Sequence, residues 1–435
     1  MNQNTEVQNA NMSIKQIKPR LISKLNDILY NFIKNNGFFV VGICLALYIK
    51  YCFLGWQTGD FNGFIKNWYN YFGTHDGFSA LKDSFYDYTP PYLYLIWVGT
   101  IYNFDPLYWT KGVSIAFEFL MAFFVAKIIM FSPLSQKVKN LWQYSFVIIL
   151  LLPTVVMNAS LWGQCDAIYT SFVIGSLYFL IRKNWIAMMI FFGIGMAVKL
   201  QTIFFAPVLL VMVATGYLPI SYLFGTAVIT ILIYLLGILP AYLVGRPLLD
   251  TTQTRGLLTI YTSQSNTYKN LTMGSAPTMY QWIKNEHYDF FYKAGLGIVS
   301  IAVFLITWLS SNLKLNELKS MSKINGSTNF IIKTAMLSSI LVPFFLPKMH
   351  ERYFFLADVI SIIYAFYFPR QFWISIMVVG ASTFAYFGYL LGTEQLPTYL
   401  TPGGLSMIMF IALIFVLQDW IKDIFNHKTR SIILK

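Results

Sequence analysis

The sequence predicts an all-α polytopic membrane protein with about 12 transmembrane helices, within a range of about 11 to 13. Of its 435 residues, 57% are hydrophobic, 18% are aromatic and only 11% are charged, and the mean hydropathy is +0.57. A soluble domain carries charge on about a quarter of its residues. Apolar runs recur along residues 38–420 and leave no soluble stretch long enough to form its own core. We therefore expect one transmembrane domain at 38–420, between cytoplasmic tails at 1–37 and 421–435.

Each expected span is an apolar run bounded by polar or charged residues. The runs lie at residues 38–54, 107–131, 142–157, 161–181, 185–198, 202–215, 218–244, 291–311, 331–346, 353–368, 371–391 and 402–420. The run from Pro91 to Asn103 is too short to cross about 30 Å of hydrocarbon. We expect it to form a short helix at the outer face.

The charge pattern orients these spans. With both termini cytoplasmic, most of the 31 Lys and Arg residues fall on the inner side, as the inside-positive rule requires. No small-residue cleavage site follows the first apolar run, so this run is expected to remain as an anchor in the plasma membrane. The net charge of +13 then reflects topology and attraction to the lipid bilayer, and no nucleic-acid partner is expected. The three cysteines lack metal-binding or CxxC spacing.

Two long outer loops, 55–106 and 245–290, indicate that the chemistry takes place outside, because most other connections are short. Within the first loop, aromatic and aliphatic residues recur at helical spacing over residues 61–72, which predicts an amphipathic helix at the membrane surface. Asp60 precedes this helix, and Asp87 precedes a double proline that fixes its backbone. Either carboxylate is a candidate catalytic group. The alternatives are a helix cap for Asp60 and a turn residue for Asp87.

Further polar side chains occur where other spans reach the outer face. Trp162, Gln164 and Asp166 open the fourth span and would bind a sugar or form hydrogen bonds between helices. Lys199, followed by Gln201, lies at the outer end of the fifth span, where the alternative is a lysine that extends to lipid phosphates. The cations of the segment 348–352 would form a small anion site, unless Glu351 instead pairs with Arg352. They are Lys348, His350 and Arg352.

Six segments, in this order along the chain, resemble the GT-C membrane glycosyltransferases, and in particular bacterial relatives of the dolichol-pathway glucosyltransferases and the GPI mannosyltransferases. The segments are Gly59-Asp60, Asp87-Tyr-Thr-Pro-Pro, Trp162-Gly-Gln-Cys-Asp166, Ala197-Val-Lys199, Ala276-Pro-Thr-Met-Tyr-Gln-Trp282 and Met349-His-Glu-Arg352. The resemblance covers nearly the whole chain. It implies transfer of a hexose from a polyprenyl-phosphate donor, on the outer face, with inversion at the anomeric carbon.

The resemblance also implies roles for residues. Asp60 would be the catalytic base, and the donor phosphate would meet Lys199 and His350 with Arg352. Some members of the family bind a divalent metal through a paired acidic motif, whereas here Phe61 follows Asp60. No metal and no other cofactor are therefore expected.

The second outer loop adds candidates for substrate contact. Tyr280 and Trp282 would stack on sugar faces, and Arg255 would touch phosphate. The alternative is an aromatic belt at the membrane interface.

The acceptor would be a cell-wall polymer, a lipid-linked glycan or a glycolipid. The donor lipid would be undecaprenyl phosphate or dolichyl phosphate. A mannosyltransferase and a glucosyltransferase fit equally well. The alternative from another class is a transporter or flippase of a lipid-linked sugar, which typically shows internal repeats and broken helices near mid-membrane. Gathering of the polar clusters at one face favours the enzyme. A membrane acyltransferase centred on His350 is a third reading.

Overall fold

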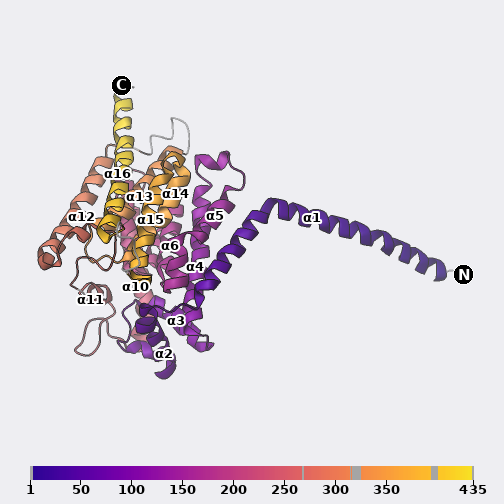
Figure 1. Ribbon diagram of the computed structural model, residues 1–435, viewed down its shortest axis with the longest axis horizontal. Coiled ribbons are helices and arrows are strands. Elements are labelled where there is room, and N and C mark those ends of the chain that lie inside the picture. Colours follow the sequence, from indigo (N-terminus) through magenta and orange to yellow (C-terminus); the bar gives the residue numbers. More distant parts are fainter. Residues whose placement is uncertain (1–2, 267–268, 314, 316–324, 393–399, 434–435) are drawn as a thin grey trace. The chain divides into compact units, whose positions relative to one another are not determined.

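The computed structural model describes residues 3–266, 269–313, 315, 325–392 and 400–433. These residues form helices joined by turns, without a β-strand, as the sequence predicts (Figure 1). The chain divides into two compact units, Met1–Tyr48 and Ile49–Lys435. The described residues of the first unit belong to helix α1 (Gln3–Leu54).

Within the described ranges, seven helices are long and apolar enough to cross a membrane. These stretches are Tyr30–Leu54 of α1, α4 (Pro106–Ile129), α10 (Ile220–Leu243), Asn285–Ser310 containing α12 (Tyr288–Ser310), Gly326–Phe345 of α13 (Asn325–Phe345), Pro369–Leu390 containing η10 (Pro369–Gln371) and α15 (Phe372–Leu390), and Pro402–Phe425 of α16 (Pro402–Ile433). A pair bent by 52°, Leu141–Leu151 and Pro153–Trp162, would make an eighth. The protein is thus helical with several candidate spans, and the count of about twelve stays a prediction.

Shorter helices occupy several of the other expected spans. They are α7 (Asp166–Ile181), α8 (Trp185–Val198), the 3₁₀ turn η5 (Leu200–Phe205) with α9 (Ala206–Ala214), and α14 (Phe355–Tyr367). At 1.5 Å per residue, a helix of 16 residues such as α7 is about 24 Å long, which is less than a hydrocarbon core of about 30 Å. These helices end early because polar residues interrupt the apolar runs at their ends.

The first long loop, 55–106, contains the amphipathic helix that the sequence predicts. It begins as the π-helix η1 (Phe61–Ile65) and continues as α2 (Lys66–Thr74), and it buries one apolar face. A short 3₁₀ helix, η2 (Gly77–Lys82), follows. The short apolar run after it forms α3 (Pro90–Ile101), as expected. Prolines start α3 because a first-turn residue needs no N–H for the helix ladder.

The second long loop, 245–290, is held against neighbouring segments at several points. Its helical pieces are α11 (Ile260–Asn266), η6 (Met279–Trp282) and η7 (Asn285–His287). Main-chain hydrogen bonds join it to the segment before the 3₁₀ turn η9 (Glu351–Phe354): the Met273 N–H donates to Met349 O at 2.9 Å, and the Lys348 N–H donates to Leu271 O at 2.7 Å. These hydrogen bonds from the loop therefore hold residues 348–350 in a fixed position.

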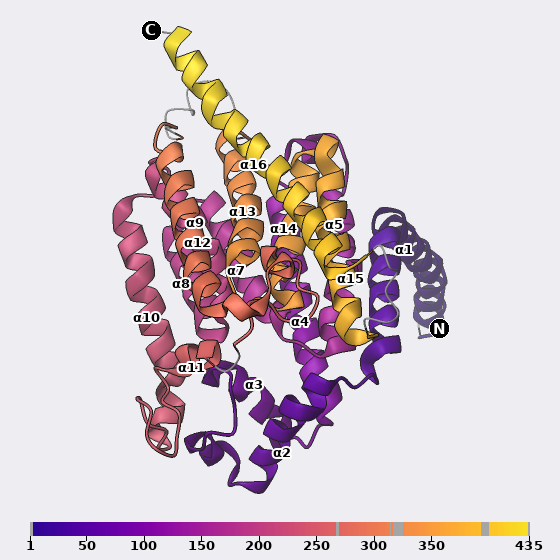
Figure 2. The ribbon, with the colours of Figure 1, turned by 60° about the vertical axis from the view of Figure 1, so that its left-hand side comes forward.

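The two long loops, 55–106 and 245–290, lie beyond the same end of the helical bundle, where α2, α3 and α11 gather (Figure 2). Thr89 in the first loop donates to Val198 O at the end of α8 at 3.0 Å. The Arg255 N–H in the second loop donates to Ser84 Oγ at 2.8 Å. These contacts cover the ends of α7 and α8, and the polar residues of those ends are enclosed beneath the loops.

Candidate functional site

Asp60 stands at the start of η1, but its side chain does not cap that helix. Thr58 caps the helix instead: its Oγ1 accepts from the Phe61 N–H at 3.3 Å and donates to Trp162 O at 2.9 Å. The helix-cap alternative for Asp60 is therefore wrong. Its carboxylate remains available for contacts across the fold.

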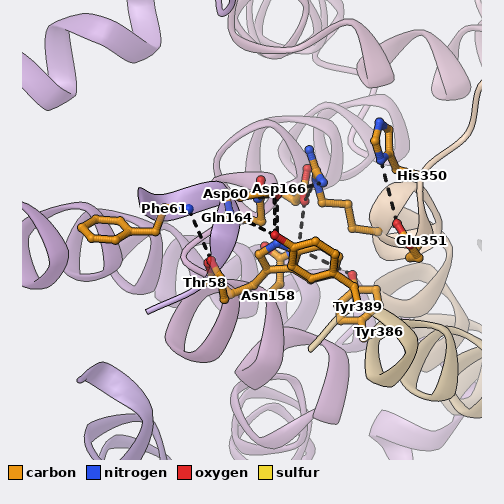
Figure 3. Close-up of polar contacts among 12 residues, drawn as sticks. Thr58, Asp60, Phe61, Asn158, Gln164, Asp166, His350, Glu351, Tyr386 and Tyr389 are labelled. Carbon is orange, nitrogen blue, oxygen red and sulfur yellow. Dashed lines mark hydrogen bonds and ion pairs between the residues drawn. The ribbon is translucent and has the colours of Figure 1, made fainter. Parts of the chain in front are cut away.

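Three side chains hold the Asp60 carboxylate, and Figure 3 shows two of them, Gln164 and Tyr389. Trp162 Nε1 donates to Oδ2 at 3.0 Å and Gln164 Nε2 donates to the same oxygen at 2.8 Å. The Tyr389 hydroxyl donates to Oδ1 at 2.9 Å. About a quarter of the Asp60 side chain stays exposed, at 26%. The carboxylate is thus fixed in direction and still open to a ligand.

The local backbone explains how Trp162 and Gln164 reach Asp60. Residues Met157–Trp162 form the π-helix η4, and it follows α5 (Leu141–Leu151) and the single turn α6 (Pro153–Val156). Gly163 ends η4 with φ +81°, a conformation that glycine adopts without strain. The Trp162 ring stacks on that of Tyr389 at 4.4 Å. π-Helical turns of this kind are frequent at functional sites.

Behind Asp60 lies a buried charge cluster centred on Asp166. Asp166 is the first residue of α7, where the helix N-terminus favours a negative charge. Lys199 forms an ion pair with its Oδ1, and Asn158 Nδ2 donates to Oδ2 at 2.8 Å. Lys199 has extended backbone angles between α8 and η5, and its side chain is buried. The interpretation of Lys199 as a lysine extending to lipid phosphates is therefore wrong.

The environment keeps Lys199 charged. Burial by itself opposes the ammonium form, but the adjacent Asp166 carboxylate outweighs it and holds the pKa of Lys199 well above its usual 10.5. Tyr88, partly buried beside the ammonium, has a pKa raised by desolvation to about 12 and stays neutral. The lysine is therefore a permanent cation at the floor of the site.

Arg352 joins the two carboxylates. Its Nη1 lies 3.7 Å from Asp60 Oδ2, and its Nε lies 3.6 Å from Asp166 Oδ2. Burial opposes the charge, whereas Tyr88 and Asp166 favour it, and the pKa of Arg352 is raised. Its Nε is buried without a hydrogen-bond partner among the described residues. The guanidinium is therefore held by charge between the two carboxylates, and Arg352 itself lines the cavity described below.

The expected cation cluster at 348–352 separates into different environments. Burial lowers the pKa of His350 below its usual 6.5, so this ring is neutral at pH 7. Glu351 lies 3.8 Å from the His350 ring and accepts from the Ser275 N–H at 3.3 Å. The hypothesis that Glu351 pairs with Arg352 is therefore wrong. Lys348 has φ +66° and places its ammonium over the rings of Tyr288 and Tyr292.

These side chains surround a cavity of about 450 Å³. The residues singled out by sequence that line it are Asp60, Asp87, Trp162, Gln164, Lys199, Gln201, His350 and Arg352. A second cavity, of about 270 Å³, adjoins the first and shares Gln201 and His350 with it. The second cavity is largely apolar, and Lys348 lies on its lining. Asp166 lies behind the wall of the first cavity and contacts it through Lys199 and Arg352.

Four candidates have structural partners. Asp87 lines the cavity, but its carboxylate forms a 2.5 Å ion pair with Arg255, which is not a lining residue. Tyr280 donates to Phe345 O at 2.7 Å, and Trp282 Nε1 donates to Gly403 O at 3.1 Å. Neither aromatic residue lines either cavity. Their placement in the packing between loop and helices does not match the expected sugar contacts.

Some residues of the site were not predicted. Tyr389 is 329 residues from Asp60 in sequence and is one of 29 tyrosines, so no local pattern marks it. Tyr88 follows Asp87 directly and lines the cavity, and its position beside a candidate acid was a usable signal. Among the described residues, no group of three or more His, Cys, Asp or Glu side chains is placed to hold a metal ion. Metal independence stays a prediction.

A scan against models of protein families finds no match for this chain, and a search of curated proteins finds none either.

Proposed function

We propose that the protein is an inverting glycosyltransferase of the GT-C type, which moves a hexose from a polyprenyl-phosphate donor to a glycan or glycolipid acceptor at the extracytoplasmic face. The observation that carries this proposal is the pairing of a firmly held carboxylate, Asp60, with a buried guanidinium, Arg352, on one cavity. Transfer from a lipid phosphate needs a base beside the acceptor hydroxyl and positive charge beside the departing phosphate. The two residues offer both.

Asp60 would act as the base. The acceptor oxygen attacks the anomeric carbon while the bond from that carbon to the phosphate oxygen breaks. The acceptor's proton passes to the Asp60 carboxylate, and the polyprenyl phosphate leaves as an anion. Three hydrogen bonds hold the carboxylate and leave it partly exposed to the cavity, which supports this role. A fixed base in a preformed cavity lowers the entropic part of the barrier.

Arg352 would contact the phosphate, with Lys199 behind it. The Arg352 Nε has no hydrogen-bond partner among the described residues, and the amide oxygen Oε1 of Gln201, at the junction of the cavities, has none there either. Buried polar atoms without partners are costly unless a ligand satisfies them. An unpartnered donor and an unpartnered acceptor on one cavity suit a ligand that carries both phosphate oxygens and hydroxyl groups.

The second cavity would take the start of the lipid chain. Its apolar lining includes Leu200, Ile203 and Leu296, which are 37%, 41% and 40% exposed. In a membrane, such partly exposed apolar residues face lipid. A polyprenyl chain would therefore lie among them while its phosphate reaches the junction of the two cavities.

The test is sugar transfer by purified protein in liposomes, with a panel of radiolabelled polyprenyl-phosphate hexoses and a membrane-glycan extract. Asp60→Asn should lower the transfer rate by about 100- to 10,000-fold, the usual effect of losing a general base. The matched control is Asp76→Asn, in the same loop. Asp76 is exposed and has φ 54°, which asparagine tolerates well, so transfer should be unchanged.

Other outcomes would contradict the proposal. Equal transfer by wild type and a normally folded Asp60→Asn protein would remove Asp60 from catalysis. No transfer with any donor, together with movement of a lipid-linked sugar between leaflets, would identify a flippase. Transfer abolished by a chelator would contradict metal independence.

A further inference from the structure

Lys111 is a buried cation that the proposed reaction does not use. It lies one turn into α4, a helix that begins at Pro106 and is capped by the Asp105 carboxylate, which accepts from the main-chain N–H groups of Leu107 and Tyr108. The Lys111 side chain is fully buried. No carboxylate pairs with it among the described residues. A buried lysine without an acidic partner needs another source of negative potential.

That source is a group of main-chain carbonyls. The Lys111 ammonium donates to Phe53 O at 3.1 Å, to Leu54 O at 3.0 Å and to Trp56 O at 2.6 Å. Leu161 O lies at 3.5 Å. An ammonium has three N–H groups, and the three shorter distances accommodate all of them. Phe53 and Leu54 end α1, where the terminal carbonyls carry the negative end of the helix dipole, and Phe53 O also accepts from the Trp56 N–H at 3.1 Å.

These carbonyls belong to the two segments that build the Asp60 site. The segment 53–56 leads directly into Thr58 and Asp60, and Leu161 is next to Trp162. A second link runs in parallel, because the Thr58 hydroxyl donates to Trp162 O at 2.9 Å. Lys111 therefore joins the segment that carries the carboxylate to the segment that carries two of its hydrogen-bond donors.

The surroundings leave the lysine little freedom. A Cβ built on Gly163 would lie 3.6 Å from Lys111 Cε, so the aliphatic stem runs directly beneath the turn between Trp162 and Gln164. An apolar side chain of similar length would fill this volume. It would leave the carbonyls of Leu54 and Trp56 without this donor and Phe53 O with only the Trp56 N–H, and the two segments would lose their common anchor.

We propose that Lys111 is a positioning residue for Asp60: its ammonium fixes the end of α1 against the η4 turn and thereby sets the carboxylate at hydrogen-bond distance from Trp162 and Gln164. This inference rests on the proposed function for its kinetic consequence. Its structural part, the joint anchoring of the two segments, stands without it.

The experiment compares Lys111→Met with Lys127→Met in liposomes. Lys127 lies on the same helix, and its ammonium is over the Phe123 ring instead of a carbonyl group. Because a displacement of about 1 Å costs about 100-fold in rate, Lys111→Met should lower kcat by about 10- to 100-fold and leave the donor KM within about twofold. Lys127→Met should change neither. Lys111→Gln, which keeps a shorter donor, should fall between wild type and Lys111→Met.

Hydrogen exchange provides a readout that does not depend on catalysis. In Lys111→Met, main-chain amides in peptides covering 53–64 and 157–166 should exchange faster together, while peptides from α13 and α16 stay unchanged. If the wild-type protein transfers no sugar, the proposed function is wrong. Hydrogen exchange would still show whether Lys111 anchors the two segments. Unchanged exchange in both segments, an unchanged kcat, or loss of the whole fold in both Lys111 variants would each overturn the positioning role.

Discussion

Replacing Asp166 by asparagine removes the anion at the centre of the buried charge cluster and keeps its volume. The Asp166 side chain is fully buried, in ion pairs with Lys199 and with Arg352 at 3.6 Å, and it accepts from Asn158 at 2.8 Å. In Asp166→Asn, the two cations face each other without a carboxylate between them, and the new amide presents an N–H₂ group to other donors. Breaking a buried pair in this way costs about 3–5 kcal/mol.

The assay is thermal unfolding in detergent, followed by tryptophan fluorescence. At about 2 °C per kcal/mol for a large chain, Asp166→Asn should lower Tm by about 6–10 °C. The matched control is Asp87→Asn, which breaks the pair with Arg255. Both side chains of that pair are 47% exposed, and an exposed pair contributes at most about 1 kcal/mol. Its Tm should change by about 2 °C or less.

A double variant separates the unpaired charge from any loss of packing. Lys199→Gln in the Asp166→Asn background removes one of the two unpaired cations, so it should recover at least half of the lost Tm. A Tm for Asp166→Asn equal to that of Asp87→Asn would refute the reasoning. So would a double variant less stable than Asp166→Asn alone, because the cost would then not arise from unpaired charge.

Two further predictions concern the cavity lining. Gln164→Leu removes a 2.8 Å hydrogen bond to Asp60 and leaves the other two donors. The kcat measured in liposomes should therefore fall by about 10- to 100-fold with the donor KM unchanged. A raised KM with an unchanged kcat would contradict this prediction. The second prediction concerns His350, whose pKa is lowered by burial in the folded protein, whereas it is about 6.5 in the unfolded chain. The neutral ring therefore contributes stability that is present above pH 6.5 and is lost as the pH falls through the folded pKa. Tm should therefore decline less between pH 7 and pH 5 in His350→Gln than in wild type, and parallel profiles would count against it.

The helical membrane character follows from composition and periodicity because both are properties of single segments. The amphipathic helix after Asp60 and the short helix before residue 103 were predicted for the same reason, and both are confirmed. The number of spans was harder to predict, because helices such as α7 and α8 are shorter than the thickness of the hydrocarbon core and pack on one another. Length alone does not tell a short span from a buried helix.

The site was predicted in part. Asp60, Gln164, Lys199 and Arg352 stand out as polar groups at span ends, and the structure brings them to one cavity. Their pairing was not accessible, because it depends on which helix ends meet. The sequence alone does not exclude a helix cap for Asp60, whereas the structure does, because the Thr58 hydroxyl accepts from the Phe61 N–H instead. Loop aromatics look alike whether they line a cavity or pack a loop.

Arg352 and Lys199 are both cations near the cavity, yet they differ in what they can offer a phosphate. Lys199 is committed to Asp166, whereas Arg352 stands 3.6 and 3.7 Å from its two carboxylates, beyond the roughly 2.7–2.9 Å of a charge-assisted hydrogen bond. The carboxylates thus hold the guanidinium in place by charge and leave Nε without a partner in the described structure. A guanidinium fixed in this way on the cavity wall needs no reorganisation when an anion arrives, which is the condition under which a preorganised charge lowers a barrier. On the proposed function, Arg352 therefore makes the phosphate contact, and Lys199 acts through Asp166 to keep Arg352 in position.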